Sequence, residues 1–153
     1  MSIKTAKTAD FDTVKEITVK TIAAIYPHYY PKGAVEFFLE HHNDENITYD
    51  IHSNKVFLCF DNEHNPVGTA TIKDNEICRL FVLPKYQGNG YGRELLEFCE
   101  KAIFEKYDEI LPDAPLPAKR IYLKRGYTST ETNLIKVNYD DFLYYDVMSK
   151  KKA

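Results

Sequence analysis

Hydrophobic residues recur at intervals of three and four positions in several segments of the chain, which is the spacing of one helix face. The helices expected from this pattern lie at 11–25, 34–42, 93–107 and 117–125. Asp10 can cap the first helix, two prolines separate it from the second, and Gly126 ends the fourth. The clearest apolar stripe belongs to the third helix and consists of Leu95, Leu96, Cys99, Ala102 and Ile103.

Short apolar runs between polar turns predict the strands. They lie at 2–6, 55–60, 66–73, 76–84 and 108–114, with two more around "LIKVN" (134–138) and "FLYYDVM" (142–148). The segment 76–113 reads strand, glycine loop, helix, strand, so we expect a right-handed crossover between two parallel strands. The order of elements predicts one α/β (α+β) domain over residues 1–153, with a mixed sheet and helices on both faces.

Charge and composition exclude some classes of function. The net charge of −3 arises from 20 basic and 23 acidic residues, so we expect neither nucleic acid nor a membrane surface as a partner. No apolar run approaches the roughly 18 residues of a membrane span, and the N-terminus lacks a signal-peptide core. Three cysteines in apolar runs indicate reduced thiols. We therefore expect a cytoplasmic protein, either a monomer or a homodimer.

Two polar features lie within or beside apolar segments. His41 and His42 are adjacent, so on a helix their side chains project about 100° apart and do not form a metal-binding pair. We expect no metal site. Arg79 lies in an otherwise apolar strand, where it could pair with a substrate carboxylate or with a neighbouring acid. The sequence leaves both alternatives open.

Three of the six glycines fall at alternate positions in "YQGNGYGREL" (86–95), directly before a predicted helix. Because glycine in an element interior costs about 0.5–1 kcal/mol, such a cluster needs a tight turn or a close backbone approach to a bulky, charged group. A loop that opens a helix also presents free N–H groups, which bind phosphate readily. Two common phosphate motifs fail by spacing. Arg93 stands where a dinucleotide fingerprint needs glycine, and Gly92 lacks the following Lys-Ser/Thr of a nucleotide P-loop.

The six residues Gln87-Gly88-Asn89-Gly90-Tyr91-Gly92 instead resemble the Gln/Arg-x-x-Gly-x-Gly/Ala loop of the GCN5-related N-acetyltransferase (GNAT) family. The surrounding "EICRLFVLPKYQGNGYGRELLE" (76–97) is similar to that family's acetyl-coenzyme A segment, and "PAKRIYLKRGY" (117–127) to its later Ala-x-x-x-Tyr-x-x-x-Gly-Phe/Tyr segment. The resemblance implies a GNAT fold with a mostly antiparallel sheet of six to seven strands. It also implies an acetyl-coenzyme A-dependent N-acetyltransferase that acts on an unidentified small-molecule or peptide amine.

The resemblance implies a set of cofactor-binding positions. They are Leu80, Phe81, Val82, Lys85, Gln87, Gly88, Asn89, Gly90, Tyr91, Gly92, Arg93, Pro117 and Ala118. One position departs from the family, since Pro115 occupies the place of an asparagine that binds the pantetheine arm in many members. A non-catalytic acyl-coenzyme A-binding or regulatory module on the same fold is the alternative function.

Two residues are candidates for the chemistry. The resemblance places the Tyr122 phenol beside the cofactor sulfur, where it can protonate the leaving thiolate. The alternative is that it is one of 12 tyrosines packed on a helix face. Glu76 coincides with a glutamate that serves as base in one branch of the family. A strand-end glutamate is also a common solvated charge, and many relatives deprotonate the amine through water, so the base stays open.

The segment "AIYPHYYPKG" (24–33) is the candidate acceptor surface, because in this fold it lies at the open end of the cleft. Rings with polar tips suit a small amine with an apolar body. The candidates for contact with the acceptor are Tyr26, His28, Tyr29 and Tyr30. The alternative is that these rings only cover the edge of the core.

Overall fold

The computed structural model describes residues 1–153. The first half of the chain contains β1 (Ser2–Thr5), α1 (Phe11–Ile25), α2 (Lys32–His41), α3 (Asp44–His52), β2 (Val56–Phe60) and β3 (Pro66–Lys73). The second half contains β4 (Glu76–Ile77), β5 (Phe81–Val82), α4 (Tyr91–Phe104), β6 (Glu109–Ile110), β7 (Asp113–Pro115), α5 (Leu116–Lys124), β8 (Thr128–Lys136) and β9 (Phe142–Lys151). Single 3₁₀ turns lie at Thr8–Asp10, Tyr26–His28, Pro84–Tyr86 and Asn138–Asp140.

The strands form two antiparallel sheets. In the first sheet, β1, β2, β3 and β4 lie side by side in that order. β5 also pairs with β3, on the same edge of β3 as β4. In the second, β7 and β8 flank β9, and β6 pairs with the C-terminal end of β9. The predicted fold class with helices on both faces is confirmed. The strand count differs, because nine strands in two sheets replace the six to seven strands expected in one.

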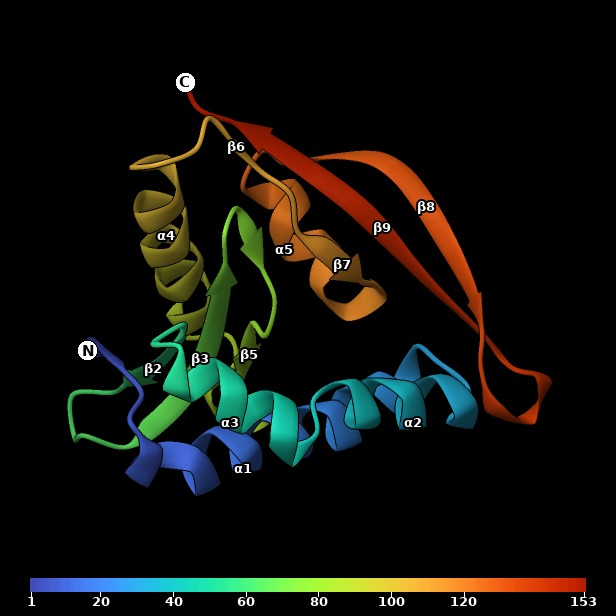
Figure 1. Cartoon of the computed structure of the whole chain (residues 1–153), viewed down its shortest axis with the longest axis horizontal. Coiled ribbons are helices and arrows are strands. Elements are labelled where there is room, and N and C mark those ends of the chain that lie inside the picture. Colours follow the sequence, from blue (N-terminus) through green and yellow to red (C-terminus); the bar gives the residue numbers. More distant parts are fainter.

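The expected parallel pairing across the segment 76–113 is not formed. β5 pairs only with β3, and β7 pairs only with β9. The two sheets are joined at one end, where Leu111 N donates to Asn75 O at 3.0 Å and Asn75 Nδ2 donates to Glu109 O at 3.2 Å. Beyond this contact the strands diverge, so β5 and β7 each present a free edge to the other (Figure 1).

Buried side chains form two clusters that account for the helix positions. One cluster joins α1, α2 and α3 to one face of the first sheet, with Val14 and Ile47 fully buried. The other joins α4 and α5 to the opposite face, with Leu95 and Leu96 fully buried. Figure 1 shows α1, α2 and α3 along the bottom of the view, with α4 to the left of β3 and α5 to its right. The apolar stripe predicted for 93–107 is therefore the core face of α4.

The structure differs from the helix predictions at the cap of α1 and at α3. The carboxylate of Asp10 accepts from Lys7 N at 2.8 Å, so it closes the preceding turn and makes no cap bond to α1. The helix α3 was not predicted, because its buried apolar residues are only Ile47 and Ile51. It begins at Asn43, whose Oδ1 accepts from Asn46 N at 2.8 Å.

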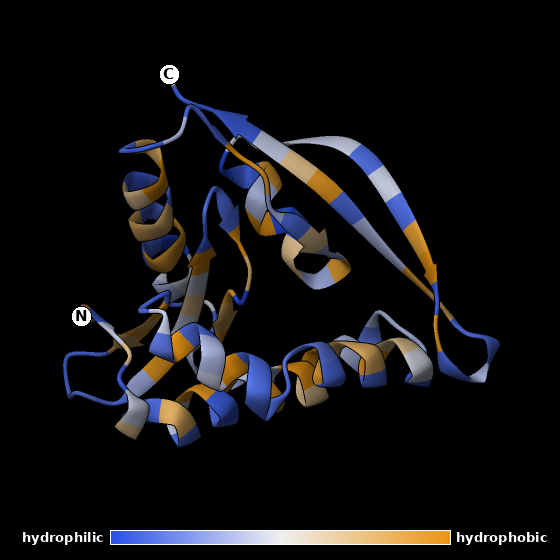
Figure 2. Ribbon diagram, in the orientation of Figure 1, coloured by the Kyte–Doolittle hydropathy of each residue, from blue (hydrophilic) through white to orange (hydrophobic).

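The hairpin of β8 and β9 extends along the second sheet to a loop beside the end of α2 (Figure 1). That loop and the C-terminal end of β9 are hydrophilic, whereas the middle of β9 alternates in hydropathy (Figure 2). Leu143 and Met148, in β9, are buried against the two clusters. None of the helices is long and apolar enough to cross a membrane.

Candidate active site

A bulge in the strand that faces the second sheet leaves backbone donors free. Ile72 pairs with Ile77, and Thr69 pairs with Phe81. The segment between β4 and β5 therefore contains one more residue than the segment of β3 that it faces, which is a β-bulge. Leu83 N donates to Val67 O at 2.9 Å, and alternate residues of an antiparallel strand face the same partner. The N–H of Val82 therefore points away from β3. The N–H of Leu80, inside the bulge, has no backbone acceptor.

The glycine loop forms a second set of free donors. Gly88 and Gly90 have φ of 82° and 88°, a left-handed region that favours glycine. Gly90 is the N-cap of α4, and no side chain caps this helix. The N–H groups of residues 88–93 make no backbone hydrogen bond. Six successive donors at a helix N-terminus make a cradle for an anion.

The side chains predicted to bind cofactor in this loop have different roles. Gln87 Nε2 donates to Val82 O at 2.9 Å and Asn89 Nδ2 to Tyr86 O at 3.0 Å, so both amides hold the loop itself. Lys85 and Arg93 are exposed and add positive charge beside the loop, although Arg93 Nη2 also lies 3.9 Å from Glu94 Oε1. The loop can therefore bind an anion mainly through its backbone.

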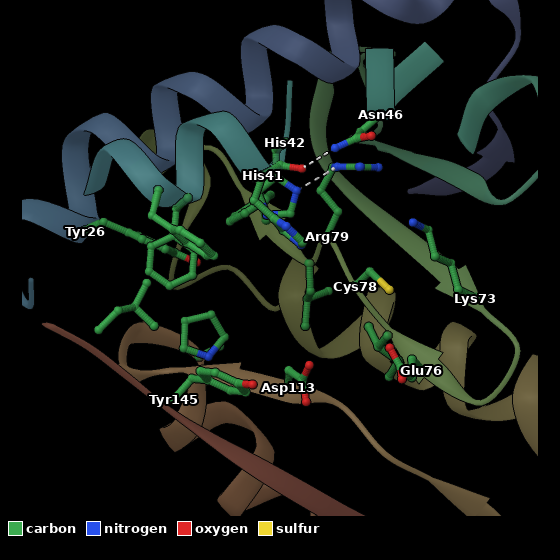
Figure 3. Close-up of a pocket in the computed structure, with 18 of the residues that line it drawn as sticks. Tyr26, His41, His42, Asn46, Lys73, Glu76, Cys78, Arg79, Asp113 and Tyr145 are labelled. Atoms are coloured by element: carbon green, nitrogen blue, oxygen red, sulfur yellow. Dashed lines mark hydrogen bonds between the residues drawn. The ribbon is translucent and has the colours of Figure 1, made fainter. Parts of the chain in front are cut away.

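A cavity of about 500 Å³ lies beside the bulge, lined by α2, β4, β5, β7, α5 and β9 (Figure 3). Of the predicted cofactor positions, Leu80, Phe81 and Ala118 line it. Pro117, at the start of α5, does not, whereas Pro115 at the end of β7 does. The cavity thus lies between the two diverging sheets, where the free N–H groups of the bulge are found.

Tyr122 lies on α5 with only 2% of its surface exposed, and it lines the cavity. Its ring packs edge-on against Tyr127 at 5.0 Å between centroids. Burial raises the pKa of Tyr122 well above 10, so the phenol stays protonated at neutral pH. The side chain is both packed and available as a proton donor.

Arg79 is buried beside the cavity, and the structure decides between its two sequence-based alternatives. Its Nη2 lies 3.0 Å from Asp50 Oδ2 on α3, and Nη1 donates to Thr71 Oγ1 at 2.8 Å. Nε donates to His42 Nδ1 at 3.3 Å. A neighbouring acid, and not a substrate carboxylate, is therefore the partner of Arg79.

His41, the last residue of α2, and His42, its C-cap, both line the cavity and are neutral at pH 7. Burial, followed by the positive charge of Arg79, lowers the pKa of His42 to about 2. Because His42 Nδ1 accepts from Arg79, the neutral ring carries its proton on Nε2. Burial, followed by Lys73 and Arg79, also lowers the pKa of His41. The residues contain no cluster of His, Cys, Asp and Glu suited to a metal ion.

Two carboxylates border the cavity from opposite sheets. Glu76 is on β4, and Asp113 is on β7 (Figure 3). Burial, and then the nearby charge of Asp113, raises the pKa of Glu76. Burial is also the first cause that raises the pKa of Asp113. Glu76 and Leu80 both line the cavity, but the bulge between them means that the two are not related by simple alternation along the strand.

The predicted acceptor residues are separated by the fold. Tyr26 is buried and lines the cavity, with its ring edge-on to Phe38 at 4.8 Å. Tyr30 has a structural role, because its hydroxyl donates to Tyr144 O and accepts from Leu116 N, both at 2.7 Å. His28 and Tyr29 are exposed and do not line the cavity. Of the four predicted acceptor residues, only Tyr26 lines the cavity.

Sequence reasoning missed Asp50, Lys73 and Asp113, together with the cavity-facing position of His41 and His42. Arg79 in an apolar strand was the one indication of a buried acid nearby, since buried charges are paired. Asp113 carried no such indication, because its place depends on the divergence of the two sheets.

Comparison with known proteins places this geometry in a family. The model of the acetyltransferase (GNAT) domain matches residues 25–143. The chain belongs to the GNAT family. The glycine loop, the bulged strand and Tyr122 all lie within the matched residues of this GNAT domain. No curated protein matches the sequence.

Solved structures share the GNAT fold. A GCN5-related N-acetyltransferase from Rhodopseudomonas palustris is 23% identical with a TM-score of 0.87, covering 99% of this chain and 95% of its own. PaiA N-acetyltransferase from Thermoplasma acidophilum, in complex with coenzyme A, is 22% identical with a TM-score of 0.74, covering 99% and 98%. YncA from Salmonella typhimurium, a putative acetyltransferase with acetyl-CoA, is 16% identical with a TM-score of 0.75, covering 99% and 93%.

Proposed function

We propose that this GNAT protein transfers the acetyl group of acetyl-coenzyme A directly to the primary amine of a small-molecule or peptide acceptor. The observation that carries the proposal is that a residue with a free backbone N–H, Leu80, and the buried Tyr122 line the same cavity. The six free N–H groups of residues 88–93 follow β5 along the chain, at the start of α4. Coenzyme A and acetyl-CoA occur in the PaiA and YncA structures of the same fold, which supports this choice of cosubstrate.

The residues around the cavity match the chemical needs of acetyl transfer. Acetyl-coenzyme A supplies a thioester whose carbonyl carbon accepts the amine. The N–H groups of Leu80 and Val82 can donate to the carbonyl oxygen as negative charge develops there. Glu76 takes the proton from the ammonium, directly or through water. As the N–C bond forms and the C–S bond breaks, Tyr122 gives its proton to the departing thiolate, and the second proton lost by the amine nitrogen restores the phenol.

The first test is thiol release from acetyl-coenzyme A with a broad panel of amines. Release that depends on both an amine and the protein supports the enzyme. Thermal stabilisation by the cofactor without release from any amine favours the alternative, a non-catalytic acyl-coenzyme A-binding module.

Replacing Gly90 by valine should raise the dissociation constant of coenzyme A at least about tenfold. The residue has φ of 88°, and a β-branched side chain there moves the backbone that carries the free N–H groups. Gly126→Val is the matched control, since Gly126 also has a positive φ of 87° but lies after α5, outside the loop. Isothermal titration calorimetry should show weaker binding only for Gly90→Val. Equal affinity in the two folded variants would overturn the assignment of the loop.

The rate should depend on pH through Glu76. The base must be ionised, so kcat/KM should fall as pH drops through the pKa of Glu76, which burial and Asp113 raise above 4.5. Glu76→Gln should remove this acidic limb and lower the plateau. If the limb persists unchanged in Glu76→Gln, another group or water accepts the proton.

A further inference from the structure

The two carboxylates that border the cavity have no ion-pair partner. Glu76 and Asp113 come from different sheets and face the same space (Figure 3). Neither takes part in any of the salt bridges of the protein. Two like charges that border one cavity repel, so a cation placed between them is favoured.

The nearby cations are held elsewhere by one buried residue. Lys73 lies directly opposite Glu76 in the β3–β4 register, yet its Nζ is 3.2 Å from Asp50 Oδ1. The guanidinium of Arg79 is bound to the other oxygen of Asp50. The charged groups around the cavity are then two cations and three carboxylates, a net charge of −1. This balance suits a ligand with a single positive charge.

The other residues that line the cavity indicate the chemical character of the rest of the ligand. The rings of Tyr26, Phe37 and Phe38 line the cavity, whose volume is within the range of small-molecule sites. Tyr26 and Tyr122 are more than nine-tenths buried, and both line the cavity. The tyrosine hydroxyls that hydrogen-bond within the protein are those of Tyr30 and Tyr139. The hydroxyl of Tyr122 is the proposed acid, so the buried hydroxyl of Tyr26 on the cavity wall is the group left without a partner, which is evidence independent of the carboxylates.

The geometry points to an acceptor that is a primary amine with an apolar body, one positive charge and no acidic group. This inference rests on the acetyl transfer proposed above. The ammonium lies between Glu76 and Asp113, and the apolar body lies against the rings of α2 and Tyr26. An acidic group on the acceptor would meet two carboxylates, while Asp50 already engages Lys73 and Arg79.

Matched acceptors test the inference. Phenethylamine and the methyl ester of phenylalanine carry a ring and one ammonium, whereas free phenylalanine adds a carboxylate to the same frame. Ethanolamine keeps the ammonium without the ring. We expect kcat/KM for phenethylamine and the ester to exceed that for free phenylalanine and for ethanolamine at least about tenfold.

A variant separates charge recognition from chemistry. Asp113→Asn should raise the acceptor KM for phenethylamine about tenfold while KM for acetyl-coenzyme A is unchanged. It should also reduce the preference for the ester over free phenylalanine. The control is Asp108→Asn, an exposed residue that does not line the cavity.

The outcomes distinguish the two proposals. If free phenylalanine is acetylated as well as its ester, or Asp113→Asn behaves like Asp108→Asn, the acceptor class is wrong while acetyl transfer stands. If coenzyme A binds but no amine of the wider panel releases thiol, both proposals fail.

Discussion

The variant Tyr122→Phe should lower kcat by roughly 10²–10⁴, the usual contribution of a general acid. The substitution keeps the ring that packs against Tyr127 and removes only the hydroxyl that makes no hydrogen bond within the protein. The fold and the cofactor affinity should therefore change little. The measurement is steady-state kinetics at neutral pH, combined with a calorimetric titration of coenzyme A.

A second variant shows whether the loss is specific. Tyr127→Phe removes the neighbouring buried hydroxyl, which has no hydrogen-bond partner and does not line the cavity. We expect it to retain most of the activity. An unchanged kcat in Tyr122→Phe, or equal losses in the two variants, would mean that Tyr122 serves packing alone.

The variant Asp50→Asn should lower the free energy of unfolding by about 3–5 kcal/mol. The side chain of Asp50 is 1% exposed and that of Arg79 is 3% exposed, so the substitution leaves a buried guanidinium without its counterion. Asparagine preserves the shape of the side chain, so the effect measures the lost charge. Chemical denaturation of the purified protein gives the difference.

An exposed ion pair provides the control for this experiment. Asp44 pairs with Lys15 at the surface, with side chains 63% and 44% exposed, and Asp44→Asn should change stability little because water screens such pairs. If Asp50→Asn is as stable as Asp44→Asn, the buried network does not hold α3 and β3 together.

Most of the helices could be predicted from the sequence because their stability depends on one apolar face. The stripe at 93–107 predicted α4, and it begins two residues earlier because Gly90 can adopt the left-handed N-cap conformation. The helix α3 escaped prediction since only Ile47 and Ile51 mark its buried face, and its third buried residue is charged. A buried Asp50 is stable only beside Arg79, a contact between distant segments.

The split into two sheets could not be predicted from strand patterns. The apolar run at 76–84 gives no indication of where a bulge falls, because a bulge is defined by register with a partner strand. Without the bulge and the divergence, Glu76 and Asp113 would not face a common cavity. The prediction of an acceptor surface at 24–33 was likewise incomplete, because the sequence pattern does not show which side chains line the cavity. Its four candidates lie within five residues, but only Tyr26 lines the cavity.

The most direct test of acetyl transfer is to follow the acetyl group itself. Acetyl-coenzyme A with an isotope-labelled acetyl group is incubated with the protein and the amine panel, and the acceptors are analysed by mass spectrometry. We predict that labelled acetyl appears on the amine nitrogen in the same amount as free coenzyme A thiol, and that Tyr122→Phe slows both equally. Bound coenzyme A with no labelled acceptor, or thiol release without acetylated amine, would contradict the account.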